Sequence, residues 1–257
     1  MASPLHAPAV DGAAASMDVT EDLLLDGRVR LVQPKTGYRA AIDPVLLAAS
    51  VPARAGERLV DLGCGAGAVF ACLAGRVPGL ETIGVERDPA MADLARRTLA
   101  ANGFTGRIEA VDLTELPATW EAGRVDHVTM NPPYLPSDRA DPSPDAGRAA
   151  AGVEDGSDLP GWIAVARRCL RHKGTLTVVH RADRLDDLLA ACAKGFGSII
   201  VYPLHPKVGR DAGRVLVRAV RGGRAPLRLA AGLILHRADG GFTEAADAVL
   251  RGAPLDL

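Results

Sequence analysis

The tetrapeptide Asn131-Pro132-Pro133-Tyr134 combines residue types that could present an amine for reaction. Two consecutive prolines remove two backbone donors and hold the chain extended, so carbonyl oxygens stay available to a ligand. The side-chain oxygen of Asn131 and the carbonyl oxygen of Pro132 could then accept both hydrogens of one planar amine. Tyr134 could stack on the ring that carries this amine, as aromatic residues stack on nucleic-acid bases.

An amine conjugated to a ring is a weak nucleophile, because its lone pair is delocalised. Accepting its hydrogens favours the pyramidal form that can attack, and no strong base is needed when the electrophile is already activated. The protein's contribution is then alignment and electrostatics. The structural alternative for this motif is a rigid loop in which Asn131 caps a turn and Tyr134 packs in the core.

A glycine-rich loop follows a short apolar stretch and precedes a helical pattern, in the segment Asp61-Leu62-Gly63-Cys64-Gly65-Ala66-Gly67. Glycines allow a ligand to approach the backbone closely, so Gly63, Gly65 and Gly67 are candidate ligand contacts. Cys64 lies inside the loop with no nearby base to activate its thiol, and we expect it to pack there beside the ligand. A tight structural turn would explain the same glycines.

Carboxylates at the ends of three expected strands favour a nucleoside ligand. Glu86 ends the next strand, where it can accept both hydroxyls of a ribose. Asp112 ends the third strand and could accept from an adenine amine, with Leu113 packing on the ring; alternatively, Asp112 is an N-cap. The loop reads G-x-G-x-G and not the G-x-G-x-x-G of nicotinamide dinucleotide sites, and Asp61 would repel a pyrophosphate. These features favour S-adenosyl-L-methionine, whose amino group is cationic.

Alternating strands and helices must position these motifs. Periodicity and breakers predict strands over 58–62, 82–86, 107–111, 125–130 and 175–180, and helices over 68–77, 89–102, 162–170 and 185–193. Strand-like segments over 198–202, 214–220 and 229–236 follow. We therefore expect an α/β fold, a Rossmann-like, doubly wound, seven-stranded and mostly parallel sheet that ends in antiparallel strands. His127 and His180 are expected to be packing or surface residues and not catalytic bases.

The 257-residue composition fits one α/β domain, which we place at residues 26–257 after a disordered tail over 1–25. The four cysteines lack metal-ligand spacing, and no secretory signal or membrane span is evident, so we expect a cytoplasmic protein without a metal.

Eight Lys and Arg residues lie between Lys207 and Arg237 against one acidic residue, Asp211. This run indicates either a nucleic-acid partner or a solvated face. The oligomeric state stays open.

Taken together, the chain resembles the class I methyltransferase superfamily, and its NPPY motif resembles the amino-methylating branch. From Arg28 to the C-terminus it is similar to bacterial tRNA adenine-N6 methyltransferases that modify the purine beside the anticodon of valine tRNA. Four stretches carry this similarity: Gln33 to Ala48, the Asp61 loop, Asn131 to Tyr134, and the Gly241-Phe-Thr-Glu-Ala segment.

The resemblance implies that Gly63, Gly65 and Gly67 line the cofactor, that Glu86 binds its ribose and Asp112 its adenine, and that Asn131 with Tyr134 holds the target amine. Tyr38 and Arg39 would close over the cofactor, unless Tyr38 packs on the sheet and Arg39 pairs with Asp43. The implied partner is RNA, specifically tRNA. Alternatives are methylation of guanine N2 in ribosomal RNA, methylation of glutamine N5 in a protein, or a non-catalytic module that binds S-adenosyl-L-methionine.

Overall fold

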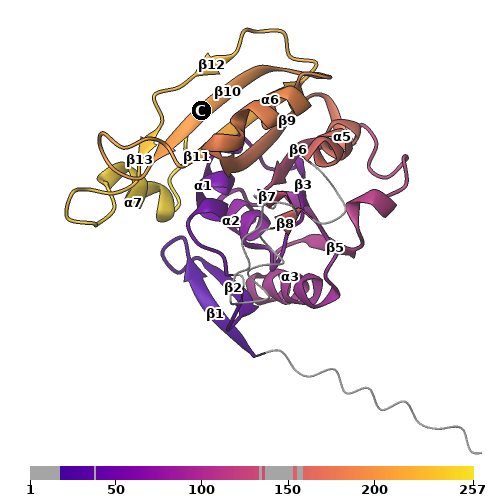
Figure 1. Ribbon diagram of the computed structural model, residues 1–257. Coiled ribbons are helices and arrows are strands. Elements are labelled where there is room, and N and C mark those ends of the chain that lie inside the picture. The colour runs from indigo at the N-terminus through magenta and orange to yellow at the C-terminus, as the bar shows by residue number, and fades with distance from the viewer. Residues whose placement is uncertain (1–17, 38, 133–134, 137–152, 155–158) are drawn as a thin grey trace, which may run out of the picture.

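The computed structural model describes residues 18–37, 39–132, 135–136, 153–154 and 159–257 (Figure 1). Its centre is a sheet of seven long strands, which lie in the order β5-β4-β3-β6-β9-β11-β10. Pairing is parallel from β5 to β9, and β11 is antiparallel to both of its neighbours. This confirms the predicted mostly parallel sheet with its antiparallel end, whereas two short strands beside β10 give the sheet nine strands and not the expected seven. The strands are β3 (Arg58–Leu62), β4 (Glu81–Glu86), β5 (Gly106–Ala110), β6 (Val125–Met130), β9 (Leu170–Arg181), β10 (Phe196–His205) and β11 (Arg214–Arg221).

Helices cover both faces of this sheet, because its inner strands are apolar on both sides. The apolar core on one face contains Leu59 of β3 and side chains of α1, α2, α3 and α7, whereas the other contains Val60 and side chains of α5 and α6. The alternation of Leu59 and Val60 is the two-residue period of a strand. The helices are α1 (Asp43–Ala49), α2 (Ala68–Arg76), α3 (Pro89–Asn102), α5 (Leu159–Cys169), α6 (Leu185–Cys192) and α7 (Glu244–Leu250), with short 3-10 turns η1 (Leu113–Glu115) and η2 (Ala182–Arg184).

An antiparallel hairpin precedes the central sheet, formed by β1 (Val19–Leu24) and β2 (Val29–Pro34). Its second strand, β2, is held to α3 by two side chains: Asn102 Oδ1 accepts from Arg30 N at 2.8 Å, and Thr98 Oγ1 accepts from Val32 N at 3.1 Å. The expected disordered tail is therefore wrong for Val19–Leu24. The sequence of β1 includes acidic residues and lacks the alternation of apolar residues that would indicate a strand with one buried face. Its pairing with β2 is what identifies it as a strand.

Two further boundaries differ from expectation. Helix α5 begins at Leu159 and not at Trp162, and Pro160 therefore lies in its first turn. Proline is tolerated there, because the N–H groups of a helix's first turn have no carbonyl partner within the helix. The expected strand over 229–236 is interrupted at Gly232, whose positive φ brings it against the Pro203 carbonyl group. Two short strands result, β12 (Arg228–Leu229) and β13 (Leu233–Ile234), each parallel to β10.

A separate two-stranded pair joins β7 (Leu135–Pro136) to β8 (Val153–Glu154) in parallel. Within the described part of the chain, every helix is too short or too polar to cross a membrane.

Candidate active site

The parallel register brings the polar residues that end β3, β4, β5 and β6 to one edge of the sheet. Asp61 is opposite Gly84 on one side and Thr129 on the other, and Glu86 is opposite Ala110. Asn131 directly follows Met130, the partner of Leu62. Ligands of open α/β sheets bind at this carboxyl edge. The candidate residues of four strands therefore lie at one edge of the sheet, although they are spread over about 70 positions of the sequence.

Asp61 is the most deeply buried of these groups, with 1% of its surface exposed. Its Oδ1 accepts a hydrogen bond of 2.8 Å from the Thr129 hydroxyl group, whereas no hydrogen-bond partner for Oδ2 is found among the described residues. Burial raises the pKa of Asp61 to about 7, with a smaller contribution from the negative charge of Glu86. A buried carboxylate oxygen without a donor costs free energy unless a ligand supplies one. Asp61 is therefore suited to a cationic ligand group.

The glycine loop has the backbone conformation that its sequence predicts, because Gly63, Gly65 and Gly67 all have positive φ. At Gly63 there is a second reason for glycine. A Cβ atom there would lie 2.4 Å from the ring of Trp162, which is buried in α5. Gly67 is the N-cap of α2, and a Cβ there would meet the Phe70 ring at 2.2 Å. Two aromatic rings therefore pack closely against the loop and leave no space for a side chain at Gly63 or Gly67.

Glu86 is connected to this loop directly. Its Oε2 accepts from Gly65 N at 2.8 Å and its Oε1 accepts from Asp88 N at 2.9 Å, so two backbone amides orient the carboxylate. Each oxygen keeps a lone pair that could accept from a hydroxyl group. The ribose assignment from the sequence is compatible with this orientation.

Cys64 is placed differently from the glycines beside it. Its side chain is buried and packs towards Gly84 of β4, where a Cβ would approach Sγ to 2.7 Å. Burial raises the pKa of the Cys64 thiol well above its ordinary value. The thiol therefore packs against β4, and its expected place beside the ligand stays a prediction.

Asp112 acts as an N-cap. Its Oδ1 accepts from Thr114 N at 2.8 Å and from the Thr114 hydroxyl at 2.7 Å, and these bonds lower the pKa of its carboxyl group, the backbone bond most. Leu113 is buried against the second core. The capping alternative is therefore correct for Oδ1. Asp112 follows β5 at the same edge of the sheet as Glu86, because β4 and β5 are parallel neighbours.

The reacting motif is described as far as Pro132. Asn131 is half-buried at the end of β6 and Pro132 is buried. Tyr134 and Pro133 lie outside the described residues, as does Tyr38. Arg39 donates to Pro34 O at 2.7 Å and pairs with Asp22 of the hairpin, whereas Asp43 forms an ion pair of 2.6 Å with Arg214. The Arg39–Asp43 pairing considered from the sequence is therefore wrong, because the sequence did not show that β1 lies beside Arg39.

The two strand histidines are structural, as predicted. His127 is buried at the opposite edge of the sheet, with its ring nitrogens 2.7 Å from Thr175 Oγ1 and 2.8 Å from Glu57 Oε2. His180 is fully buried near the end of β9, and burial lowers its pKa to about 4. Throughout the described ranges, no cluster of three or more His, Cys, Asp or Glu side chains could hold a metal ion.

Sequence reasoning missed two residues that fix this site. Thr129 orients Asp61, and its signal was a polar residue near the carboxyl end of a buried strand, between the apolar residues Val128 and Met130. Trp162 packs on Gly63, and nothing in its own helix indicates that contact.

The chain is similar to several known methyltransferases. Residues 40–143 match the family described as the methyltransferase small domain. A tRNA1(Val) (adenine(37)-N6)-methyltransferase of Dickeya chrysanthemi is 30% identical over 87% of this chain and 90% of its own length. One of Aeromonas hydrophila is 28% identical over 82% of this chain and 87% of its own. The crystal structure of a predicted O-methyltransferase from Agrobacterium tumefaciens is 31% identical, with a TM-score of 0.69, over 82% of this chain and 97% of that one.

These relatives are similar to more than four fifths of the chain. The carboxyl edge has a glycine loop, a glutamate oriented by backbone amides, and a buried aspartate whose Oδ2 has no donor among the described residues. The protein is an enzyme, its cofactor is S-adenosyl-L-methionine, and the chain belongs to the family of class I S-adenosyl-L-methionine-dependent methyltransferases that contains these relatives.

Proposed function

We propose that the protein methylates the exocyclic N6 of an adenine in tRNA, at the purine beside the anticodon. The observation that carries this proposal is the Asn131-Pro132 pair at the end of β6. Strand β6 pairs with β3, which leads directly into the glycine loop. Its oxygens accept hydrogens, so it suits an N–H₂ group better than a hydroxyl group. The names of the relatives from Dickeya chrysanthemi and Aeromonas hydrophila supply the substrate class.

The cofactor would be held by the residues that the carboxyl edge gathers. Asp61 Oδ2 would accept from the cationic amino group, Glu86 would accept from the ribose hydroxyls, and Asp112 Oδ2 would accept from the adenine amine. Gly63, Gly65 and Gly67 would allow close contact with the loop backbone, and Leu113 would pack on the adenine ring. S-adenosyl-L-methionine supplies an electrophilic methyl group on a sulfonium.

Asn131 and Pro132 would orient the target amine. The Asn131 side-chain oxygen accepts one amine hydrogen and the Pro132 carbonyl oxygen accepts the other, which aligns the nitrogen lone pair with the methyl group. Accepting both hydrogens also stabilises the positive charge that develops on this nitrogen during transfer, and its proton then leaves to solvent. Tyr134 would stack on the base.

A basic surface at the same edge supports an RNA substrate. Lys207 and Arg210 lie in the connection between β10 and β11, beside the carboxyl end of β9. Within the described residues, neither has a carboxylate within ion-pair distance, whereas Arg214 is paired with Asp43 and Arg237 with Asp239. Lys207 and Arg210 could therefore contact phosphates near the target nucleotide.

The test is methyl transfer from labelled S-adenosyl-L-methionine to total RNA from cells that lack this gene, followed by digestion to nucleosides. We expect label in N6-methyladenosine from tRNA. Label in N2-methylguanosine, in a ribose hydroxyl, or only in the glutamine of a release factor would each contradict the adenine assignment. The Asn131→Ala variant should bind the cofactor as the wild type does and lose transfer by about 10²–10³-fold, the cost of removing one positioned hydrogen-bonding group.

A further inference from the structure

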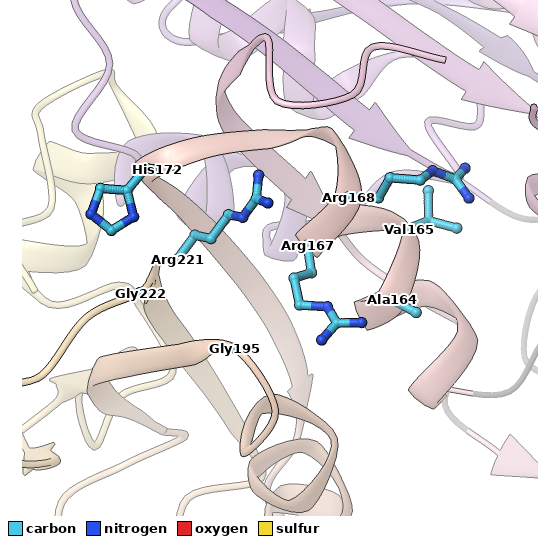
Figure 2. Close-up of a pocket in the computed structure, with 8 residues that line it drawn as sticks. All are labelled: Ala164, Val165, Arg167, Arg168, His172, Gly195, Arg221 and Gly222. Carbon is cyan, nitrogen blue, oxygen red and sulfur yellow. The ribbon is translucent and has the colours of Figure 1, made fainter. Parts of the chain in front are cut away.

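A basic pocket lies at the sheet edge opposite the cofactor loop, where β9 begins and β11 ends (Figure 2). Its volume is about 630 Å³. Arg167 and Arg168 contribute from α5, His172 from β9 and Arg221 from β11, and the glycines 195 and 222 complete the wall. No acidic residue lines it among the described residues. Figure 2 shows Arg167, His172 and Arg221 extending in different directions from three neighbouring segments, whereas Arg168 extends from another side of α5. Arg168 donates to the Leu116 carbonyl group at 3.5 Å.

Two glycines make room for two of these basic side chains. A Cβ at Gly195 would lie 2.5 Å from Arg167 Cδ, and a Cβ at Gly222 would lie 2.7 Å from His172 Cε1. Both glycines have positive φ, and Gly222 N donates to Gly195 O at 2.9 Å, which joins the two loops into one wall. Arg167 and His172 therefore pack closely against the backbone of these two loops.

The charge of the pocket is uncompensated. Within the described residues, Arg167, His172 and Arg221 have no carboxylate within ion-pair distance, and Arg221 is oriented by donating to Leu170 O. Three more basic residues are exposed, and each lies one or two positions along the sequence from a residue that lines the pocket: Lys173 beside His172, Lys194 beside Gly195, and Arg224 near Gly222. A planar guanidinium group pairs well with phosphate oxygens, and a surrounding basic surface favours a chain of phosphates over one small ion.

Helix α5 connects this pocket to the cofactor loop. Trp162 near its start packs on Gly63, and Arg167 lies near its end; the 11 residues span about 16 Å at about 1.5 Å per residue. We propose that the pocket binds a backbone phosphate of the RNA substrate, away from the reacting nucleotide. This inference rests on the proposed function and adds a second anchoring point to it, on the opposite edge of the sheet.

The test measures the affinity of wild type and variants for unmodified tRNA between about 50 and 200 mM salt, with S-adenosylhomocysteine present. Arg167→Gln should make the plot of log affinity against log salt shallower by about 0.7 to 0.9 for each phosphate that the variant no longer binds. It should also raise KM for tRNA and leave kcat at saturating tRNA unchanged. Arg97→Gln, an exposed arginine on α3 with no ion pair within the described residues, is the matched control and should keep the wild-type slope.

The outcomes separate the two proposals. Wild-type protein that binds tRNA without salt dependence contradicts the proposed function itself. Salt-dependent binding with the same slope for Arg167→Gln and Arg97→Gln leaves the function intact and overturns the pocket assignment. If inorganic phosphate raises the melting temperature of wild type but not of Arg167→Gln, while the tRNA slopes agree, the pocket holds a small anion and the RNA assignment is wrong. Arg221→Gln repeats the test if Arg167→Gln does not fold.

Discussion

The Thr129 hydroxyl group donates a hydrogen bond of 2.8 Å to Asp61 Oδ1 across the β3–β6 strand pair. The contact arises because the parallel register sets Asp61 directly opposite Thr129. Both side chains are buried, so the bond acts in surroundings of low polarity, where a hydrogen bond to a charged group is worth about 1.5–3 kcal/mol. It holds one carboxylate oxygen and leaves the other for a ligand.

Replacing Thr129 by Val should raise the pKa of Asp61 further, because the variant lacks the hydrogen bond that favours its ionised form. Cofactor affinity at pH 7 should therefore fall, and the pH at which binding reaches half its maximum should move upwards. Calorimetric titration with S-adenosyl-L-methionine measures both. Thr177→Val is the matched control: Thr177 is opposite Thr129 on β9, and its hydroxyl group has no hydrogen-bond partner among the described residues. A shift of equal size in the control would contradict the role of Thr129.

Cofactor binding by the wild type should depend on pH through Asp61, whose pKa burial raises to about 7. The cationic amino group requires the ionised carboxylate, so affinity should fall by about tenfold per pH unit below pH 7. Affinity should be greatest just above pH 7, where the carboxylate is ionised and the amino group still carries its proton. Binding below pH 7 should release a proton, which buffers of different ionisation enthalpy reveal. Asp61→Asn should bind weakly at every pH, and a pH-independent wild type would refute this assignment.

The same group should affect the stability of the cofactor-free protein. Its folded pKa lies above the unfolded value near 4, so the unfolded chain binds fewer protons between about pH 4 and 7. The contribution of Asp61 to the free energy of unfolding therefore decreases as pH rises through this window. Urea unfolding of wild type and Asp61→Asn at pH 5 and 7.5 measures it: the advantage of the variant over the wild type should be larger at pH 7.5.

Gly63→Ala should destabilise the protein more than a positive φ alone would. The new Cβ would meet the Trp162 ring at 2.4 Å, in addition to about 1–2 kcal/mol for an alanine in left-handed conformation. Gly103→Ala is the control, since Gly103 has φ +63 against φ +65 at Gly63 but open space around its Cβ position. Urea unfolding gives both costs, and Trp162→Leu should partly restore Gly63→Ala. Equal costs at the two glycines would show that the ring contact is unimportant.

Glu86→Gln should weaken cofactor binding by roughly 10- to 100-fold, the loss expected for hydrogen bonds to a charged acceptor. The variant also replaces one of the two oxygens that accept from Gly65 N and Asp88 N with an amide donor. Glu109→Gln removes a carboxylate from the neighbouring strand β5, where it is opposite Val85, and should bind the cofactor normally. Equal affinities of the two variants would exclude Glu86 from the cofactor site.

The sequence alone predicted which chemical groups lie at the strand ends. The Asp61 loop, Glu86 and Asn131-Pro132 are short local patterns, and glycine or proline fixes their backbone wherever the rest of the chain lies. The alternation of strands and helices then indicated a parallel sheet that would bring those ends to one edge, as the register shows.

Only the tertiary structure decided which segments far apart in the chain would meet. It set Thr129 against Asp61, Trp162 against Gly63, and β1 beside Arg39. It also divided the basic run over 207–237, because β11 extends roughly 24 Å and carries Arg214 to the carboxyl edge and Arg221 to the opposite one. Local patterns fix the conformation of a few residues, whereas pairing and packing depend on partners that no single segment specifies.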